Sequence, residues 1–184
     1  NLGKDYKPII GISIGDPAGI GPEITLKAVT KKEVTDICRP LVVGDVKVLE
    51  AAMDVTKLKA EMRSVKSVDE ADFKGSAINV LNLNNAGLTK IKYGKISKEA
   101  GNAAYKAVEK VILLALDNKI DATVTGPINK ESINLAGHHY SGHTEIYADR
   151  TCALYYIRGY KGIDPASPRF GQPSQRERGR RWAF

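Results

Sequence analysis

Short apolar runs that each end in a turn and lead into a helical pattern constrain the fold of this chain most. Residues 9–14 form a mostly β-branched run that suits a strand buried on both faces. A glycine-rich turn at residues 15–23 ends the run. In it, Pro22 suits the first helical position and Glu23 suits the positive start of a helix, which we expect to reach about Lys31. The sequence therefore opens with strand, turn and helix, the repeating unit of α/β folds.

The same alternation continues along the chain. Residues 40–44 predict a second strand, and residues 46–53 predict the helix behind it. Residues 58–65 and 77–83 are expected to form two further extended segments. The regular exchange of strands and helices predicts an α/β fold for residues 1–157.

A long helix then leads into a further strand. Ser97 is predicted to cap this helix, which should end near Asn118. Its apolar residues recur at helical spacing, so we assign them to the core: Ala100, Ala104, Ala107, Val111 and Leu114. The helix delivers the chain into residues 121–125, which we interpret as a buried strand.

The segment after that strand holds the candidate site. The strand breaks at Gly126-Pro127, and a short helix restarts with Lys130 in its first turn. Gly137 is placed to cap this helix, and the next one is expected near Thr144. A lysine and three histidines fall within fourteen positions, where strand and helix ends meet. Open α/β sheets bind their ligands at such ends.

The glycine-rich turn at residues 15–23 allows two interpretations. Its spacing fits neither the dinucleotide pattern G-x-G-x-x-G nor the phosphate loop G-x-x-x-x-G-K-[ST]. It is either a tight turn that starts a helix or a loop whose free backbone N–H groups face an anion or a substrate.

Composition limits the possible classes of protein. With 184 residues, 42% of them apolar, the chain can form one core of ordinary size. Nothing at its start resembles a signal peptide, no apolar run approaches the roughly 20 residues of a membrane span, and the two cysteines lack metal-ligand spacing. We therefore expect a cytoplasmic protein that is not bound to a membrane.

The charge distribution argues against nucleic acid as a partner. Of the net charge of +7, residues 158–184 contribute +5, from seven basic and two acidic residues. The preceding 157 residues carry only +2 and show no basic stripe with interleaved aromatic residues. We expect no nucleic-acid binding by the folded part.

Three stretches occur in an order that resembles a known family. They are Gly-Asp-Pro-Ala-Gly-Ile-Gly-Pro-Glu at residues 15–23, Thr-Gly-Pro-Ile-Asn-Lys at 125–130 and Gly-His-Thr-Glu at 142–145. Together they resemble the 4-hydroxythreonine-4-phosphate dehydrogenase family of pyridoxal phosphate biosynthesis. The resemblance spans roughly residues 7–152, about the first half of a typical member. The sequence His-His-Tyr-Ser-Gly-His at 138–143 also resembles the sister branch that oxidises D-erythronate or D-threonate 4-phosphate.

The resemblance implies a fold, a reaction and partners. The fold would be the first part of a two-lobed subunit with α/β/α layers, similar to isocitrate and isopropylmalate dehydrogenases. The reaction would be an NAD-dependent oxidation of a secondary alcohol, assisted by a divalent metal (Zn, Mg or Co) and followed by loss of CO₂. The substrate would be 4-phosphooxy-L-threonine, or the related 4-phospho-D-erythronate or 4-phospho-D-threonate. The family is homodimeric, and its active site draws on both subunits.

Four residues are carried over as site candidates. His143 and Thr144 match the family's substrate-contacting pair, and Lys130 and Asp16 lie in matching segments as candidates for substrate or phosphate contact. His143 is the candidate catalytic residue, either as the base that takes the hydroxyl proton when the hydride leaves or as a hydrogen-bond donor. Structural alternatives stay open: His143 or Thr144 as a helix cap, and Lys130 as a solvated side chain. No residue is assigned to the nicotinamide cofactor.

A zinc site is a competing interpretation of the same region. His139, His143 and Glu145 would supply ligand types that zinc accepts, with the two histidines at i and i+4. Gly142 between them makes a continuous helix doubtful, and the metal-binding histidines of the family lie downstream. We therefore assign no metal ligand to this chain.

The resemblance ends after Cys152. Residues 158–184 are rich in Arg, Pro and Gly and contain no histidine. We interpret this tail as disordered or out of frame. The chain is then expected to be a partial copy of the dehydrogenase. The alternative is an inactive truncated pseudoenzyme, or a half-domain that binds phosphate without catalysis.

Overall fold

A single parallel sheet organises the chain. The computed structural model describes residues 6–87 and 91–157. Its five strands lie in the order β3-β4-β2-β1-β5, and every pairing is parallel. Their bounds are β1 Ile9–Ser13, β2 Arg39–Gly44, β3 Met62–Val65, β4 Ile78–Asn82 and β5 Ala122–Thr125. Residues 158–184, for which disorder was expected, lie outside the described part.

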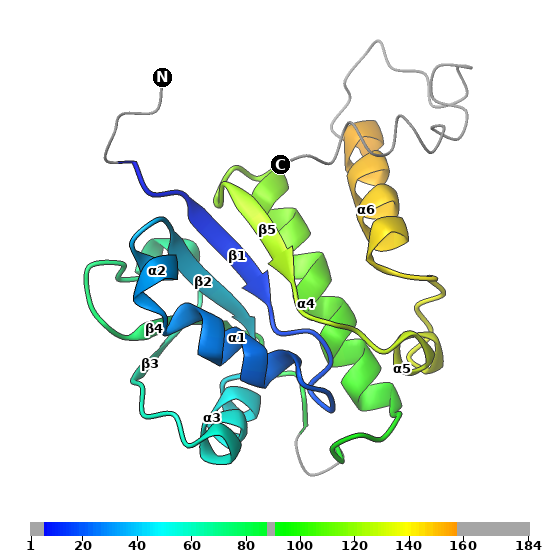
Figure 1. The fold of residues 1–184 in the computed structure, drawn as a ribbon. Helices are drawn as coiled ribbons and strands as arrows, with labels where there is room; N and C mark the ends of the chain where they lie inside the picture. Colours follow the sequence, from blue (N-terminus) through cyan, green and yellow to red (C-terminus); the bar gives the residue numbers. More distant parts are fainter. Residues whose placement is uncertain (1–5, 88–90, 158–184) are drawn as a thin grey trace.

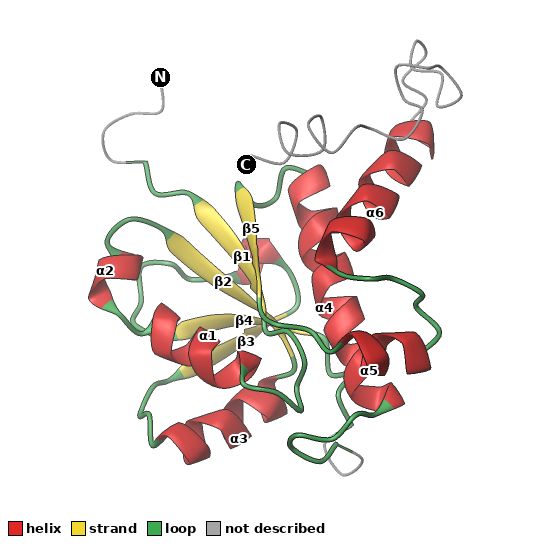
Figure 2. Ribbon diagram, turned by 45° about the vertical axis from the view of Figure 1, so that its right-hand side comes forward, coloured by secondary structure: helices red, strands yellow, loops and turns green. Residues whose placement is uncertain are grey.

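Helices cover both faces of the sheet (Figures 1 and 2). Helices α1 and α3 pack on one face through Leu26 and Leu49, and α4 packs on the other through Val111. Helices α5 and α6 lie against α4, and the Tyr147 hydroxyl of α6 also donates to the Thr123 hydroxyl of β5 at 2.7 Å. The helix bounds are α1 Gly21–Val29, α2 Lys32–Thr35, α3 Val46–Thr56, α4 Lys98–Leu116, α5 Lys130–Leu135 and α6 His143–Ile157, with a short 3-10 helix η1 at Val68–Glu70. The α/β/α layers are those that the family resemblance implies.

The long helix α4 forms as its pattern predicts. The Ser97 side chain accepts a hydrogen bond from the Ala100 amide at 3.1 Å, which caps the first turn. The whole apolar stripe of the helix is buried. At Gly101 an added Cβ would lie only 1.9 Å from the Ser132 carbonyl oxygen. The missing side chain therefore lets α5 pack directly on the backbone of α4.

Two predicted strands differ from those observed. Only Met62–Val65 of the segment 58–65 is a strand. The strand at residues 121–125 is not buried, because β5 lies at the edge of the described sheet and pairs there with β1 alone. Val124 is accordingly 51% exposed. An alternating apolar pattern does not distinguish an edge strand from a central one.

The strand order of the sheet reverses at β1. The chain leaves β1 through α1 toward β2, and it reaches β5 on the opposite side of β1 after α4. Figure 1 shows the arrowheads of β1 and β5 side by side, facing the loop that leads to α5. Such a reversal of strand order is where open α/β sheets bind ligands. Within the described residues, no helix is long and apolar enough to span a bilayer.

Candidate active site at the joined ends of β1 and β5

The turns after β1 and β5 are bonded to each other through their backbones. The Gly126 amide donates to the Ser13 carbonyl at 2.8 Å, and the Asp16 amide donates to the Pro127 carbonyl at 2.9 Å. Gly15 has a φ of +74°, and a Cβ there would lie 2.3 Å from the Pro127 oxygen. Glycine is required at this point because neither the conformation nor the space admits a side chain. The two motifs, more than 100 residues apart in sequence, thus form one structure.

Asp16 shapes the turn after β1. Its side chain is 5% exposed, and its Oδ1 accepts a hydrogen bond from the Ala18 amide at 2.7 Å. Its carbonyl accepts another from Gly19 at 3.0 Å. Burial raises the pKa of Asp16, and the bond from Ala18 offsets part of that rise. The carboxyl group therefore organises the turn, whatever it contacts in a ligand.

His143 joins the third motif to the second. It is the first residue of α6, it is half-buried, and its Nε2 lies 3.2 Å from the Gly126 carbonyl oxygen. Burial lowers the pKa of His143, and the bond to Gly126 opposes this in part. Thr144 follows as the second residue of α6 and is exposed, so it is not the residue that precedes and caps the helix.

Lys130 lies near the start of α6. It is the first residue of α5, which Asn129 caps by accepting from the Ser132 amide at 2.9 Å. The Lys130 side chain is exposed, and its Cε lies 3.9 Å from where a Cβ on Gly142 would be. Its positive charge also contributes to lowering the pKa of Glu145. The structure thus brings all four predicted residues to the turn after β1 and the neighbouring starts of α5 and α6.

Glu145 has a role that the sequence analysis missed. Its carboxylate accepts hydrogen bonds from the Ser141 amide at 2.8 Å and from the Ser141 hydroxyl. These two bonds are the main reason why the pKa of Glu145 is lowered. Glu145 is the third residue of α6, the usual position for a glutamate that reaches back over a helix start. It fixes the first turn, which carries His143 and Thr144.

The zinc interpretation of this region is not supported. His139 lies in the loop before α6, while His143 contacts Gly126 and Glu145 binds Ser141. Across residues 6–87 and 91–157, no three His, Cys, Asp or Glu side chains gather closely enough to hold a metal ion. The described residues thus do not fit the divalent metal that the family resemblance implies, and we derive no step through it. We likewise assign none of them to a dinucleotide.

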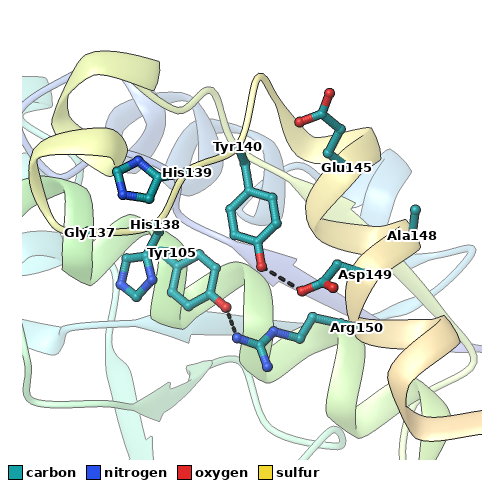
Figure 3. Close-up of a pocket in the computed structure, with 9 residues that line it drawn as sticks. All are labelled: Tyr105, Gly137, His138, His139, Tyr140, Glu145, Ala148, Asp149 and Arg150. Carbon is teal, nitrogen blue, oxygen red and sulfur yellow. Dashed lines mark hydrogen bonds between the residues drawn. The ribbon is translucent and has the colours of Figure 1, made fainter. Parts of the chain in front are cut away.

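A separate pocket of about 490 Å³ lies beside the start of α6 (Figure 3). The loop after α5 forms one wall with His138, His139 and Tyr140, α6 forms another, and Tyr105 from α4 closes the base. His138 stacks on Tyr105 with 3.6 Å between ring centroids, and Tyr140 lies parallel to Tyr105 at 5.8 Å. None of the four predicted site residues lines this pocket.

Polar contacts in this pocket tie α6 to the rest of the protein. The Tyr140 hydroxyl donates to Asp149 at 2.6 Å, and Arg150 donates to the Tyr105 hydroxyl (Figure 3). Arg150 also pairs with Glu109 at 2.9 Å. His138 and His139 lie in the turn between α5 and α6 and line this pocket. Because Tyr140, Asp149, Arg150 and Tyr105 already form bonds between α6 and the rest of the protein, we interpret the pocket mainly as the attachment of α6.

Comparison with known proteins identifies the family. Residues 36–158 match the family described as pyridoxal phosphate biosynthetic protein PdxA, a match that contains the second and third motifs. A Clostridium botulinum protein named "Putative D-threonate 4-phosphate dehydrogenase" is 41% identical over 160 residues, which is 84% of this chain and 48% of that protein. A protein of the same name from Halalkalibacterium halodurans is 44% identical over 145 residues, covering 79% of this chain and 43% of its own length.

Solved structures agree with this match. A 4-hydroxythreonine-4-phosphate dehydrogenase from Burkholderia phymatum superposes with a TM-score of 0.77 and 38% identity, covering 80% of this chain and 44% of that one. The enzyme of the same name from Klebsiella pneumoniae gives a TM-score of 0.74 and 32% identity, covering 81% and 45%. The chain spans about half the length of these relatives. Motif order, sheet topology and sequence identity together place this chain in the PdxA family of pyridoxal phosphate biosynthetic proteins.

Proposed function

We propose that this chain forms part of the substrate site of an NAD-dependent dehydrogenase. The enzyme would oxidise the secondary alcohol of a small phosphorylated hydroxy acid and release CO₂ from the product. Its substrate would be 4-phospho-D-threonate or 4-phospho-D-erythronate, or else 4-phosphooxy-L-threonine. Relatives with both kinds of name occur among the similar proteins, so both kinds of substrate belong in the test.

One observation carries this proposal: Gly126 holds the three motifs together. Its amide binds the end of β1, its neighbour Pro127 accepts from Asp16, and its carbonyl contacts His143. The motifs therefore meet at the carboxyl ends of β1 and β5, where the strand order reverses. Open α/β sheets bind ligands at such a position. Exposed Thr144 and Lys130 supply a hydroxyl and a positive charge beside them, groups that suit a phosphorylated acid.

The chemistry assigns a role to each side chain. His143 takes the hydroxyl proton, because an alcohol transfers hydride only as its O–H bond breaks. Thr144 donates a hydrogen bond to the bound substrate, and Lys130 attracts its negative charge. Asp16 holds the turn after β1 in place. NAD, when bound, accepts the hydride. A homodimer in the cytoplasm, with no nucleic acid and no membrane as partner, completes the proposal.

An assay of NAD reduction tests the proposal. The three phosphorylated acids are supplied separately with NAD, with NADP instead, and with or without Zn²⁺, Mg²⁺ or Co²⁺. Binding of each acid to the same protein is measured by calorimetry without cofactor. Turnover supports the dehydrogenase. Binding without turnover under any condition supports the alternative, a half-domain that binds phosphate and does not catalyse. A chain that binds none of the acids overturns the assignment of this site.

A further inference from the structure

Residues 91–98 form a loop with three exposed lysines, Lys92, Lys95 and Lys98. The loop contains no acidic residue, so it contributes +3 to a part of the chain, residues 1–157, whose net charge is only +2. Outside residues 158–184, the positive charge of the protein is therefore concentrated in this loop. We call residues 91–98 the basic rim.

Two hydrogen bonds attach the basic rim to the candidate site. The Gly94 amide donates to the Ala18 carbonyl at 2.7 Å, in the turn after β1. The Ser97 amide donates to the Ser132 hydroxyl of α5 at 3.3 Å. The rim therefore extends from the β1 turn to α5, and Lys95 lies between its two points of attachment.

The rim lysines have no anionic partner in the part of the chain that the structure describes. The lysine ion pairs found there all lie outside the rim: Lys32–Asp36, Lys106–Glu109 and Lys119–Asp69. Glu99 follows the rim directly and forms no ion pair with it among the described residues. Lys98 is also the first residue of α4, where the positive end of the helix repels a positive charge. A bound anion would reduce the repulsion that acts on these lysines.

We propose that the basic rim binds the phosphate group of a ligand that occupies the candidate site. An ionised phosphate accepts hydrogen bonds and carries up to two negative charges, and lysine ammonium groups supply both donors and positive charge. The proposed substrate and NAD both carry phosphate, so the chemistry is shared by two sources. This inference rests on the proposed function, because both ligands belong to the proposed reaction.

Amide NMR locates the contact. Backbone signals of the ¹⁵N-labelled whole chain are followed at low salt while D-threonate, 4-phospho-D-threonate and NAD are added in separate titrations. A ligand with phosphate should shift the signals of residues 91–98, and D-threonate, which has no phosphate, should not. Shifts with 4-phospho-D-threonate alone identify the acid as the source, and shifts with NAD alone identify the cofactor. Rim signals that move with neither ligand overturn the proposal.

Substitution tests the role of charge. Lys92→Gln, Lys95→Gln and Lys98→Gln, combined in one variant, should weaken binding of the ligand that moves the rim signals about 10-fold, measured by calorimetry at low salt. The matched control changes three exposed lysines outside the rim, Lys27, Lys31 and Lys59, to Gln. It removes the same charge and should alter the affinity less than about 2-fold. Equal weakening in both variants would show that only net charge matters, and would overturn the rim as a site.

Salt gives a second readout of the same contact. Raising the ionic strength from about 0.01 M to 0.15 M shortens the range of electrostatic interactions from about 30 Å to about 8 Å. Binding to the wild-type chain should weaken accordingly, whereas binding to the rim variant should depend much less on salt. The same salt dependence in both proteins would contradict the proposal.

The outcomes separate this inference from the proposed function. If 4-phospho-D-threonate and NAD bind the rim variant as tightly as the wild type, the rim assignment fails and the proposed function stands. If a phosphate-bearing ligand moves the rim signals but no acid supports NAD reduction, the dehydrogenase fails for this chain and the rim assignment stands.

Discussion

Two titratable side chains lie at the joined strand ends, and burial favours the neutral form of both. Burial raises the pKa of Asp16 and lowers the pKa of His143. Each is held by a single backbone partner: the Ala18 amide for Asp16 and the Gly126 carbonyl for His143. No ion pair to either is found among the described residues. Both groups therefore make the stability of the fold depend on pH, with opposite signs.

Replacing Asp16 by Asn should remove one of these pH dependences. The folded pKa of Asp16 lies above that of the unfolded chain, about 3.9. As pH rises from about 4 toward 7, the unfolded chain loses this proton first, so wild-type stability falls relative to Asp16→Asn. Asn keeps an acceptor for the Ala18 amide. Urea unfolding of both proteins at several pH values measures the difference, and a difference independent of pH would contradict the burial of Asp16.

His143 should act in the opposite direction. Its folded pKa lies below the unfolded value of about 6.5, so its contribution to stability is present above that pH. As pH falls from about 7 through the folded pKa, the unfolded chain binds the proton more readily and wild-type stability drops relative to His143→Gln. Thermal unfolding of the two proteins across this range gives the sign. If the wild-type protein instead became more stable than His143→Gln on acidification, the lowered pKa of His143 would be refuted.

At the level of elements, the candidate site depends on the contact between two strand ends. The turns after β1 and β5 approach so closely that a Cβ on Gly126 would lie 2.7 Å from the carbonyl carbon of Ile14. The hydrogen bonds at Ser13 and Asp16 require the same approach. Helix starts then add the side chains: His143 begins α6 and Lys130 begins α5. Any change that separates the two turns should separate these groups as well.

Gly126→Ala should therefore destabilise the protein. The clash is with backbone atoms, which cannot rotate away, so we expect a loss of about 1–3 kcal/mol in unfolding free energy and weaker substrate binding. Gly19→Ala is the matched control in the neighbouring turn. There, the atom nearest to an added Cβ is the backbone carbonyl oxygen of Asp16 at 3.5 Å, which is an ordinary van der Waals contact. Chemical denaturation measures both variants, and equal stability of the two would contradict the close approach at Gly126.

At the level of the whole molecule, three apolar clusters hold the layers together. One lies between the sheet and α1 and α3, a second between the sheet and α4, and a third joins α4 to α5 and α6. The third cluster contains no strand residue and includes the fully buried Tyr105. Beside this cluster, Arg150 of α6 forms an ion pair with Glu109 of α4. The position of α6, and with it His143, depends on this smaller cluster.

Arg150→Ala should loosen α6 selectively. The change removes the bonds to Glu109 and Tyr105 and the packing of the side chain, while Glu109 keeps Lys106 at 2.7 Å. Because Arg150 is partly exposed, we expect a loss of only about 1–2 kcal/mol. Amide hydrogen exchange should show faster exchange in α6 and unchanged protection in β1, β2 and β4. Uniformly faster exchange would mean that α6 does not open separately.

The control for this prediction is an ion pair on the surface. Lys32, the first residue of α2, binds Asp36 just after that helix at 2.6 Å, and the Lys32 side chain is 83% exposed. Lys32→Ala should change the unfolding free energy by about 0.5 kcal/mol or less and should leave exchange in α6 unaltered. If Lys32→Ala lowered the unfolding free energy as much as Arg150→Ala does, partial burial of the Arg150–Glu109 ion pair would add nothing to stability.

The local features of this fold could be predicted because their causes lie within a few residues. A β-branched run before a glycine turn marks β1, Ser97 caps α4, and Lys130 begins α5 after the break at Gly126. The cap of α6 could also have been found, since Glu145 occupies the third helical position. The three motifs also indicated the family, and the comparisons with known proteins confirm it.

What the sequence alone determined is thus which segments are strands, turns and helices, and which family they belong to. Only the tertiary structure decided that β5 lies at the edge of the described sheet, that Asp16 is buried, and which nitrogen of His143 contacts Gly126. The physical reason is distance along the chain. Periodicity and turn chemistry act over a few residues, whereas the bonds of Gly126 to Ser13 and of Asp16 to Pro127 depend on the order in which the strands assemble.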